Sequence, residues 1–194
     1  MVYLTISSGI GAGVAVDGNV LRGWDANAGD IGHLTIDPHG FMTCGCGHDG
    51  HWEAYCSGEN IPHYATQLHR EDPVDTALPI ETGDFTAADV FEYAGEDDFA
   101  THVLDQISHW NAIGVANMVH AFAPLVISIG GAVAINNPDQ IMDPIRERLD
   151  DMVMANIPDL QLTTHGDDVV VRGALASALT GGTGDSTAAR QPRS

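Results

Sequence analysis

The chain has 194 residues, of which 44% are hydrophobic, and its 27 aspartates and glutamates against seven arginines give a formal net charge of −20. This length is enough for one hydrophobic core, and the apolar content excludes intrinsic disorder. There is no lysine and no basic patch, so nucleic-acid binding is not expected, and no run approaches the roughly 20 apolar residues of a membrane helix. Acidic residues are spread along the whole chain, which favours a surface adapted to high salt, as in a halophile. We therefore expect a soluble, cytoplasmic protein.

A glycine-rich hairpin is predicted at the start of the chain. The β-branched run Val2 to Ile6 breaks at a glycine-rich string, residues 7–13, and a strand pattern restarts at Val14. Backbone N–H groups of such a bend can converge on phosphate oxygens. From these residues alone, an ordinary glycine turn is an equally good interpretation.

A group of potential metal ligands follows in the segment 29–56. Two cysteines one residue apart, with a histidine on either side, offer two thiolates and two imidazoles: His33, Cys44, Cys46 and His51. Zinc takes four such ligands in a tetrahedron, and Gly45, Gly47 and Gly50 can supply tight bends around the ion. Small buried thiols and unrelated histidines are the other interpretation. No disulfide is expected, and Cys56 should be a small buried hydrophobe.

Helical patterns dominate the middle of the chain. Residues 53–68 have helical spacing with interruptions at Ser57-Gly58 and Pro62, and residues 70–83 form a loop rich in Pro, Asp and Thr. Thr86 is a plausible cap for a short helix that ends at Tyr93. A long amphipathic helix is predicted over residues 99–122, where His109 and His120 are interpreted as structural.

The last part of the chain predicts a buried strand followed by a glycine pair and a helix. Pro124 ends the long helix, the apolar run 125–129 is a strand, and Gly130-Gly131 forms a turn of the kind in which a ligand can approach the backbone closely. A turn that serves packing alone is the other interpretation of this glycine pair. The later predicted elements are a helix over residues 140–154, an edge strand over 160–164 and a disordered tail over 181–194.

Two of these segments together resemble the signature of the ROK family, which comprises bacterial and archaeal sugar kinases and sugar-sensing transcriptional repressors. The segment Gly29-Asp30-Ile31-Gly32-His33 is similar to the family's G-E-x-G-H, and the segment from Cys44 to Glu53 is similar to its C-x-C-G-x-x-G-C-x-E. The chain departs from the pattern twice, with Asp30 for the glutamate and His51 for the last cysteine. His51 preserves a zinc-competent set, and Asp30 keeps the charge but is shorter by one methylene group.

The resemblance implies an α/β chain with the actin-like ATPase (ribonuclease H-like) fold and a structural zinc ion. It implies that His33 binds zinc through one ring nitrogen and a sugar hydroxyl through the other, while Asp30 and Glu53 hold further hydroxyls. The glycine-rich bend would be the second phosphate loop of the fold, and the glycine pair would belong to its adenosine segment. Residues 169–179 would be the family's short closing helix. The implied nucleotide contacts are Ser8, Gly9, Gly11, Gly130 and Gly131.

The resemblance assigns residues 1–180 to the C-terminal half of a two-domain ROK kinase, without a counterpart of the N-terminal domain that carries the catalytic Asp. The first hypothesis is therefore an incomplete glucokinase-like enzyme that is inactive alone. The complete enzyme would use ATP and Mg²⁺ to phosphorylate the 6-hydroxyl of a hexose such as glucose, with the N-terminal half on a separate chain or restored by a corrected gene start. The alternatives are a sugar-sensing module of a ROK repressor, a non-catalytic sugar-binding protein, and a degenerate fragment. We also expect a homo-oligomer, with the number of subunits left open.

Overall fold

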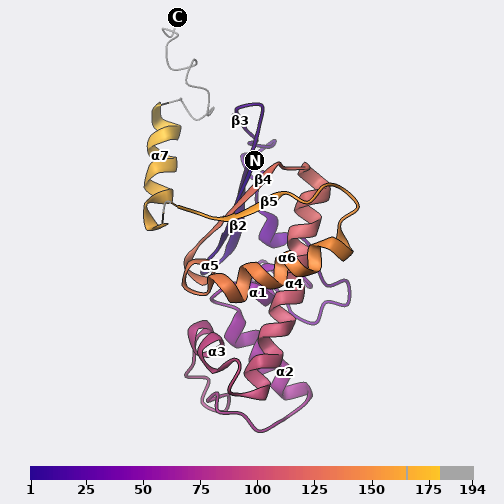
Figure 1. Cartoon of the computed structure of the whole chain (residues 1–194). Coiled ribbons are helices and arrows are strands. Elements are labelled where there is room, and N and C mark those ends of the chain that lie inside the picture. Colours follow the sequence, from indigo (N-terminus) through magenta and orange to yellow (C-terminus); the bar gives the residue numbers. More distant parts are fainter. Residues whose placement is uncertain (165, 180–194) are drawn as a thin grey trace, which may run out of the picture.

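A mixed sheet forms one side of the computed structural model, which describes residues 1–164 and 166–179 (Figure 1). Its strands are β1 (Val2–Ile6), β2 (Ile10–Val16), β3 (Asn19–Val20), β4 (Val126–Gly130) and β5 (Asp159–Leu162). Their order in space is β3-β2-β1-β4-β5, with β1 antiparallel to β2 and parallel to β4, and with β4 parallel to β5. The predicted hairpin, buried strand and edge strand are confirmed.

Alternating side chains give the sheet one apolar face. In β1, Val2, Leu4 and Ile6 are buried, and the residues between them are only partly buried. The register sets Leu4 beside Ile129 of β4, so the buried side chains of the two strands lie on the same face. Two helices, α4 (Asp98–Phe122) and α6 (Pro138–Met152), lie beside the sheet and share its apolar core (Figure 1). Parallel inner strands with helices packed on them are typical of the predicted α/β class.

The shorter helices connect these elements, and most of them agree with the sequence patterns. They are η1 (Ile31–His33), α1 (Glu53–Cys56), α2 (Ile61–Glu71), α3 (Ala87–Tyr93), α5 (Ala132–Asn136), η2 (Gly166–Asp168) and α7 (Val169–Leu179). The helical stretch after the metal-ligand segment is divided at Ser57, and Thr86 begins α3 in a capping box with Asp89. The helix predicted over 140–154 starts earlier, at Pro138, because proline needs no hydrogen-bond partner in a first turn.

The predicted tail, 181–194, lies outside the described residues. Within the described ranges, no helix has the length and apolar character needed to cross a lipid bilayer.

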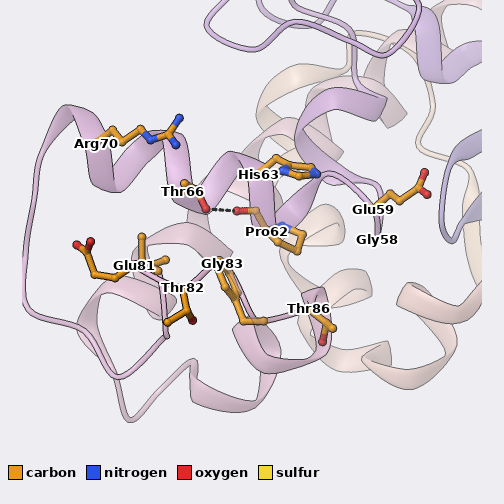
Figure 2. A pocket seen from close by; sticks show the side chains of 12 residues that line it. Gly58, Glu59, Pro62, His63, Thr66, Arg70, Glu81, Thr82, Gly83 and Thr86 are labelled. Carbon is orange, nitrogen blue, oxygen red and sulfur yellow. Dashed lines mark hydrogen bonds between the residues drawn. The ribbon is translucent and has the colours of Figure 1, made fainter.

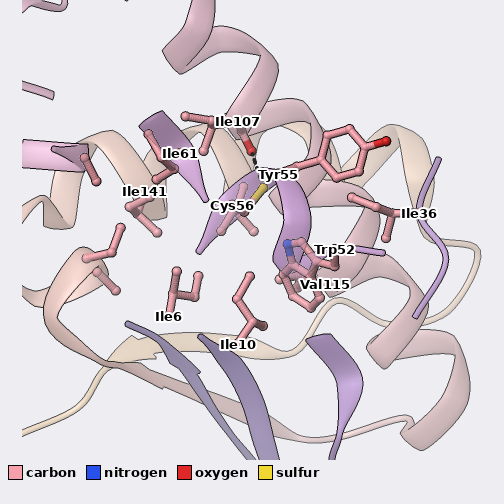
Figure 3. Close-up of a cluster of buried hydrophobic side chains, with 14 of the residues drawn as sticks. Ile6, Ile10, Ile36, Trp52, Tyr55, Cys56, Ile61, Ile107, Val115 and Ile141 are labelled. Atoms are coloured by element: carbon pink, nitrogen blue, oxygen red, sulfur yellow. Dashed lines mark hydrogen bonds between the residues drawn. The ribbon is translucent and has the colours of Figure 1, made fainter. Parts of the chain in front are cut away.

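The short helix α1 is anchored in the core (Figure 3). Trp52, which precedes it, and Cys56, which ends it, are fully buried. The Trp52 indole N–H donates to Asn111 Oδ1 on α4 at 2.9 Å, and the Cys56 thiol donates to the Ile107 carbonyl at 3.6 Å. Burial raises the pKa of the Cys56 thiol, which is therefore the small hydrophobe that the sequence predicts. These contacts fix the position of Glu53, the first residue of α1.

Candidate metal centre and ligand site

The loop that leads into η1 lies directly against β2. The Ala12 N–H donates to the Gly29 carbonyl at 2.7 Å, and a Cβ atom at Gly29 would lie 1.9 Å from the Ala12 carbonyl oxygen. A Cβ atom at Gly32 would lie 2.3 Å from the carbonyl oxygen of Ile10. Both positions therefore require glycine, because a side chain would collide with the strand backbone. The two glycines fix η1, and with it His33, against the hairpin.

Residues 34–52 fold back on themselves and bring two distant histidines together. The Trp52 N–H donates to the Leu34 carbonyl at 3.0 Å, and Thr35 pairs with His51 in an isolated antiparallel bridge. The ring centroids of His33 and His51 lie 5.4 Å apart. His33 and His51 are 18 positions apart in the sequence, and backbone pairing at the base of the loop brings them together.

The cysteines lie at the far end of the same loop. The Cys44 N–H donates to the His48 carbonyl at 2.8 Å, which closes a tight turn around them. Gly47 and Gly50 have the positive φ angles that the sequence predicts, 88° and 74°. Gly45 is not among the positive-φ glycines, so the bend at Cys44 uses the ordinary region of backbone space.

The structure brings all four predicted metal ligands together. The ligand atoms of His33, Cys44, Cys46 and His51 all lie within 4.8 Å of one another. His33 Nδ1 lies 3.7 Å from Cys44 Sγ, and His51 Nδ1 lies 3.2 Å from Cys46 Sγ. A tetrahedral zinc ion with ligands at about 2.0–2.3 Å would set adjacent ligand atoms about 3.3–3.8 Å apart. The donor set and its spacing therefore fit a tetrahedral metal ion.

The surroundings affect the ligands differently. Cys44 is buried, and burial raises the pKa of its thiol. Cys46 is exposed, and hydrogen bonds from the backbone and side chain of His48 lower the pKa of its thiol. Burial, together with the neighbouring His33, lowers the pKa of His51 and favours its neutral form. A thiolate and a neutral imidazole are the forms that bind a metal ion.

A buried carboxylate that the sequence analysis missed stiffens this loop. Asp37 is only 4% exposed and accepts hydrogen bonds from the Tyr55 hydroxyl at 2.6 Å and from the N–H groups of His39 and Phe41 at 2.8 and 2.9 Å. Burial opposes ionisation of Asp37, but these hydrogen bonds hold its pKa below the usual value. In sequence, Asp37 followed by proline indicates a turn, whereas its partner Tyr55 on α1 becomes evident only in the fold.

The predicted sugar ligands gather around η1. Glu53 Oε2 accepts the Ile10 N–H at 2.8 Å, and a Cβ atom at Gly32 would lie 3.2 Å from the same oxygen. Glu53 is therefore beside the residue that precedes His33. Asp30 is exposed, its carbonyl accepts the His33 N–H at 3.1 Å, and its carboxylate makes no capping hydrogen bond.

The predicted nucleotide residues lie largely at one edge of the sheet, where the parallel strands β1 and β4 end. Ser8 and Gly9 form the turn after β1, and Gly130 and Gly131 follow at the end of β4. A Cβ atom at Gly131, where φ is 90°, would lie 2.4 Å from the Ile6 carbonyl oxygen. This close approach joins the turn to the glycine pair, as expected where the carboxyl ends of parallel strands meet.

Two nearby glycines differ from the expectation. Gly11 lies inside β2, opposite Thr5, and not in the turn itself. Gly58, which the sequence marked only as a helix interruption, donates its N–H to the Ser7 carbonyl at 2.7 Å. The Ser-Gly pair between two helical stretches was the available signal of a close backbone approach.

A pocket of 520 Å³ opens beside Gly58 (Figure 2). Figure 2 shows His63, Thr66 and Arg70 of α2 on one side and the loop that carries Thr82 on the other. Its volume falls within the range of about 300–1,000 Å³ that is typical of small-molecule sites. The sequence predicted this loop but not its role as the wall of a pocket.

The sheet, its covering helices and the glycine turns at the strand ends are those of the actin-like ATPase fold, as the solved structures below confirm. The sequence model of the ROK family matches residues 1–180, and the chain belongs to this family.

Among curated relatives, a glucokinase of Pyrobaculum calidifontis is 35% identical over 179 residues, which cover 92% of this chain and 57% of that protein. A glucokinase of Halalkalibacterium halodurans is 34% identical and covers 89% of this chain and 54% of its own length. A xylose repressor of Bacillus spizizenii is 27% identical over 154 residues, 79% of this chain and 36% of the repressor. The chain thus spans about half the length of the glucokinases that it matches.

Solved structures agree with this fold. A ROK hexokinase from Thermus thermophilus matches with a TM-score of 0.74 and 34% identity, covering 89% of this chain and 54% of the hexokinase. A ROK glucokinase from Streptomyces griseus, solved in complex with glucose and AMPPNP, matches with a TM-score of 0.72 and 24% identity, covering 89% of this chain and 58% of that one.

Proposed function

We propose that this chain is the C-terminal, ligand-binding part of an ATP-dependent sugar kinase that phosphorylates the 6-hydroxyl of a hexose such as glucose. The observation that carries the proposal is the hydrogen bond between Glu53, next to the metal-ligand loop, and Ile10 of the hairpin. It couples one candidate hydroxyl-binding acid, Glu53, to the hairpin whose turn carries candidate phosphate contacts. Phosphoryl transfer requires both substrates to be held side by side in this way.

In this proposal, His33, Cys44, Cys46 and His51 hold a structural zinc ion, which supplies a cross-link between the base and the tip of the loop. The Nδ1 atom of His33 faces Cys44, so Nε2 is the ring nitrogen left to bind a sugar hydroxyl. The carboxylates of Asp30 and Glu53 accept hydrogen bonds from further hydroxyls.

The nucleotide phosphates are proposed to bind at the sheet edge, with Mg²⁺ accompanying ATP. The nucleoside would extend into the pocket beside α2, since Gly58 both lines this pocket and contacts the Ser7 carbonyl. Support comes from the two glycine turns at the ends of β1 and β4, because Gly9, Gly130 and Gly131 have no side chain of their own. The proposed contacts are Ser8, Gly9, Gly11, Gly130 and Gly131.

We propose that residues 1–180 act together with a separate N-terminal ROK domain that supplies the catalytic Asp, so no catalytic residue is assigned in this chain. An exposed apolar stripe on α7 supports the need for another domain. Val171, Leu175 and Leu179 are 59%, 59% and 73% exposed and are spaced four residues apart, on one face of the helix. The homo-oligomer expected from the sequence stays a prediction, which sedimentation velocity would test.

The sugar part is tested by calorimetric titration of the zinc-loaded chain with glucose. We expect binding by the parent and, for Glu53→Gln, an affinity reduced at least about tenfold, because the variant loses a charged acceptor. Glu92→Gln, at an exposed position on α3, is the matched control and should bind like the parent. Absence of glucose binding by the zinc-loaded parent would overturn the proposal.

The phosphotransfer part is tested with ATP, Mg²⁺ and glucose. Glucose 6-phosphate should form when the chain is combined with the N-terminal part of a glucokinase relative, and not with the chain alone. Product formed by the chain alone would contradict the proposed division of the site.

The second candidate function is a sugar-sensing module of a ROK repressor or a non-catalytic sugar-binding protein, which the similarity to a xylose repressor favours. Such a module needs the sugar ligands but no nucleotide. Titration with a non-hydrolysable ATP analogue and Mg²⁺ separates the two candidates, because only the kinase requires that the analogue bind.

A further inference from the structure

Beside the four grouped ligands, the metal-ligand loop places a further imidazole, that of His48, next to Cys46. His48 is exposed, and its Nδ1 lies 3.6 Å from Cys46 Sγ, compared with 3.2 Å between the same sulfur and Nδ1 of His51. The rings of His48 and His51 are stacked, with centroids 5.6 Å apart and planes only 13° from parallel. The two imidazoles therefore offer equivalent nitrogens to one thiol from adjacent positions.

The backbone holds these two histidines differently. His51 pairs with Thr35 at the base of the loop and precedes the fully buried Trp52. His48 lies in the tight turn at the tip, where its carbonyl accepts the Cys44 N–H at 2.8 Å. The His48 backbone is thus kept beside the thiols while its exposed ring can change rotamer.

We propose that His48 is an exchange ligand of the metal centre, taking the place of His51 beside Cys46. The inference rests on the zinc centre of the proposed function. Zinc has no geometric preference from d-electrons, and with either histidine the ion keeps two sulfur and two nitrogen ligands. An ion arriving from solvent can bind first to the exposed pair, Cys46 and His48, and then pass to His51 without losing a protein ligand.

Zinc affinity of the metal-free full chain, measured by competition with a chromophoric chelator, tests the exchange. His51→Ala should bind one zinc within about tenfold of the parent affinity, and the double variant His51→Ala/His48→Ala at least about a hundredfold more weakly. The matched control is His51→Ala/His39→Ala, because His39 is also an exposed histidine of this loop, whereas it is the His48 ring that contacts Cys46. It should behave like His51→Ala.

Cobalt substitution gives a second readout of the same variants. His51→Ala should keep the absorption of a four-coordinate ion with two sulfur and two nitrogen ligands, and the His51→Ala/His48→Ala variant should lose it. Equal zinc affinities for these two variants would overturn the proposal that His48 can replace His51. A parent chain that binds no zinc would instead overturn the metal centre itself.

His48→Ala alone provides a test that does not depend on the folding of a His51 variant. It should bind zinc with the parent affinity, because the four grouped ligands are intact. Its transfer of zinc to the chelator should be several-fold slower than that of the parent. An unchanged transfer rate would contradict the proposal.

Discussion

The Asp37 carboxylate accepts three hydrogen bonds, one from the buried Tyr55 hydroxyl and two from the partly buried N–H groups of His39 and Phe41. It connects the stretch before the cysteines to Tyr55 on α1, and so to the core. A hydrogen-bonded carboxylate in this position contributes more to stability than a surface ion pair, since Asp37 and its partner Tyr55 are both buried.

We predict that Asp37→Asn destabilises the chain by about 1–3 kcal/mol at pH 7, because the amide cannot accept from all three donors as an anion does. The folded pKa of Asp37 is depressed, so its stabilisation is complete above the unfolded pKa and is lost as the pH falls through the folded pKa. The difference between parent and variant should therefore shrink below about pH 4. Urea unfolding at pH 7 and pH 3 measures this difference in the free energy of unfolding between parent and variant. Asp84→Asn, at an exposed loop position, is the control; an equal loss in both variants would contradict the prediction.

For single residues, sequence reasoning succeeded where the residue type itself indicates the function. The cysteines and histidines of the metal group were predicted because two thiols and two imidazoles at short spacing are recognisable in one dimension. Asp37, Gly58 and His48 were missed because their roles depend on Tyr55, Ser7 and the ring of His51, which only the fold brings near.

Among the elements, α1 and α4 meet at a point of very close packing. A Cβ atom at Gly114 of α4 would lie 2.4 Å from ring atoms of Trp52. Trp52 follows the proposed ligand His51 and precedes Glu53, so the packing of these two helices sets the position of both candidate sites.

We predict that Gly114→Ala destabilises the chain although alanine favours helices by about 1 kcal/mol over glycine. Overpacking against a fully buried ring costs about 1–3 kcal/mol, and here it also displaces the metal-ligand loop. The midpoint temperature of thermal unfolding and the zinc affinity should both decrease. Gly173→Ala on α7 is the matched control, because nothing lies within 4 Å of its Cβ position, and it should be neutral or stabilising. A stabilised Gly114→Ala would show that the indole can move aside.

Removal of the metal should act on the loop more than on the sheet. We predict that Cys44→Ser/Cys46→Ser loses zinc and melts at a lower temperature than the zinc-loaded parent. Most of the far-UV circular dichroism should be retained, since the sheet, α4 and α6 pack together mainly through apolar residues outside the ligand loop. Cys56→Ala is the control, because Cys56 is fully buried and outside the ligand group, and it should keep one zinc per chain. Full zinc content in the double variant would contradict the assignment of Cys44 and Cys46 as zinc ligands.

The elements themselves were largely predictable. Val2 to Ile6 and the run before Gly130 are apolar and β-branched, and α4 has an unbroken helical stripe. The start of α6 was predicted at residue 140, two residues too late, because the prediction began at the first residues of the apolar stripe and did not use Pro138, which is favoured in a first turn. Order in space, with β4 inserted beside β1, is fixed by long-range pairing that local patterns do not contain.

For the whole molecule, charge is the dominant property. A net charge of −20 leaves many carboxylates without a basic partner, and the described part of the chain contains two side-chain salt bridges, Arg146 with Asp143 and Arg148 with Asp105. Repulsion among the remaining carboxylates opposes the compact state.

We predict that stability increases with salt, because the screening length falls from about 8 Å at 0.15 M to about 3 Å at 1 M and the like charges then interact less. Urea unfolding at several potassium chloride concentrations measures this. The halophilic origin expected from the composition predicts a rise that continues beyond 1 M. A midpoint that stays constant or falls between 0.15 and 2 M would contradict both expectations.

The hydrogen bond from Ile10 to Glu53 spans 43 positions of the chain. A backbone amide proton held by a remote side chain is protected from deuterium exchange for as long as that side chain stays in place. The deuterium-exchange rate of the Ile10 amide therefore reports on the position of Glu53. A hexose that displaced the Glu53 carboxylate from this hydrogen bond would increase that rate at the start of β2, without any phosphoryl transfer.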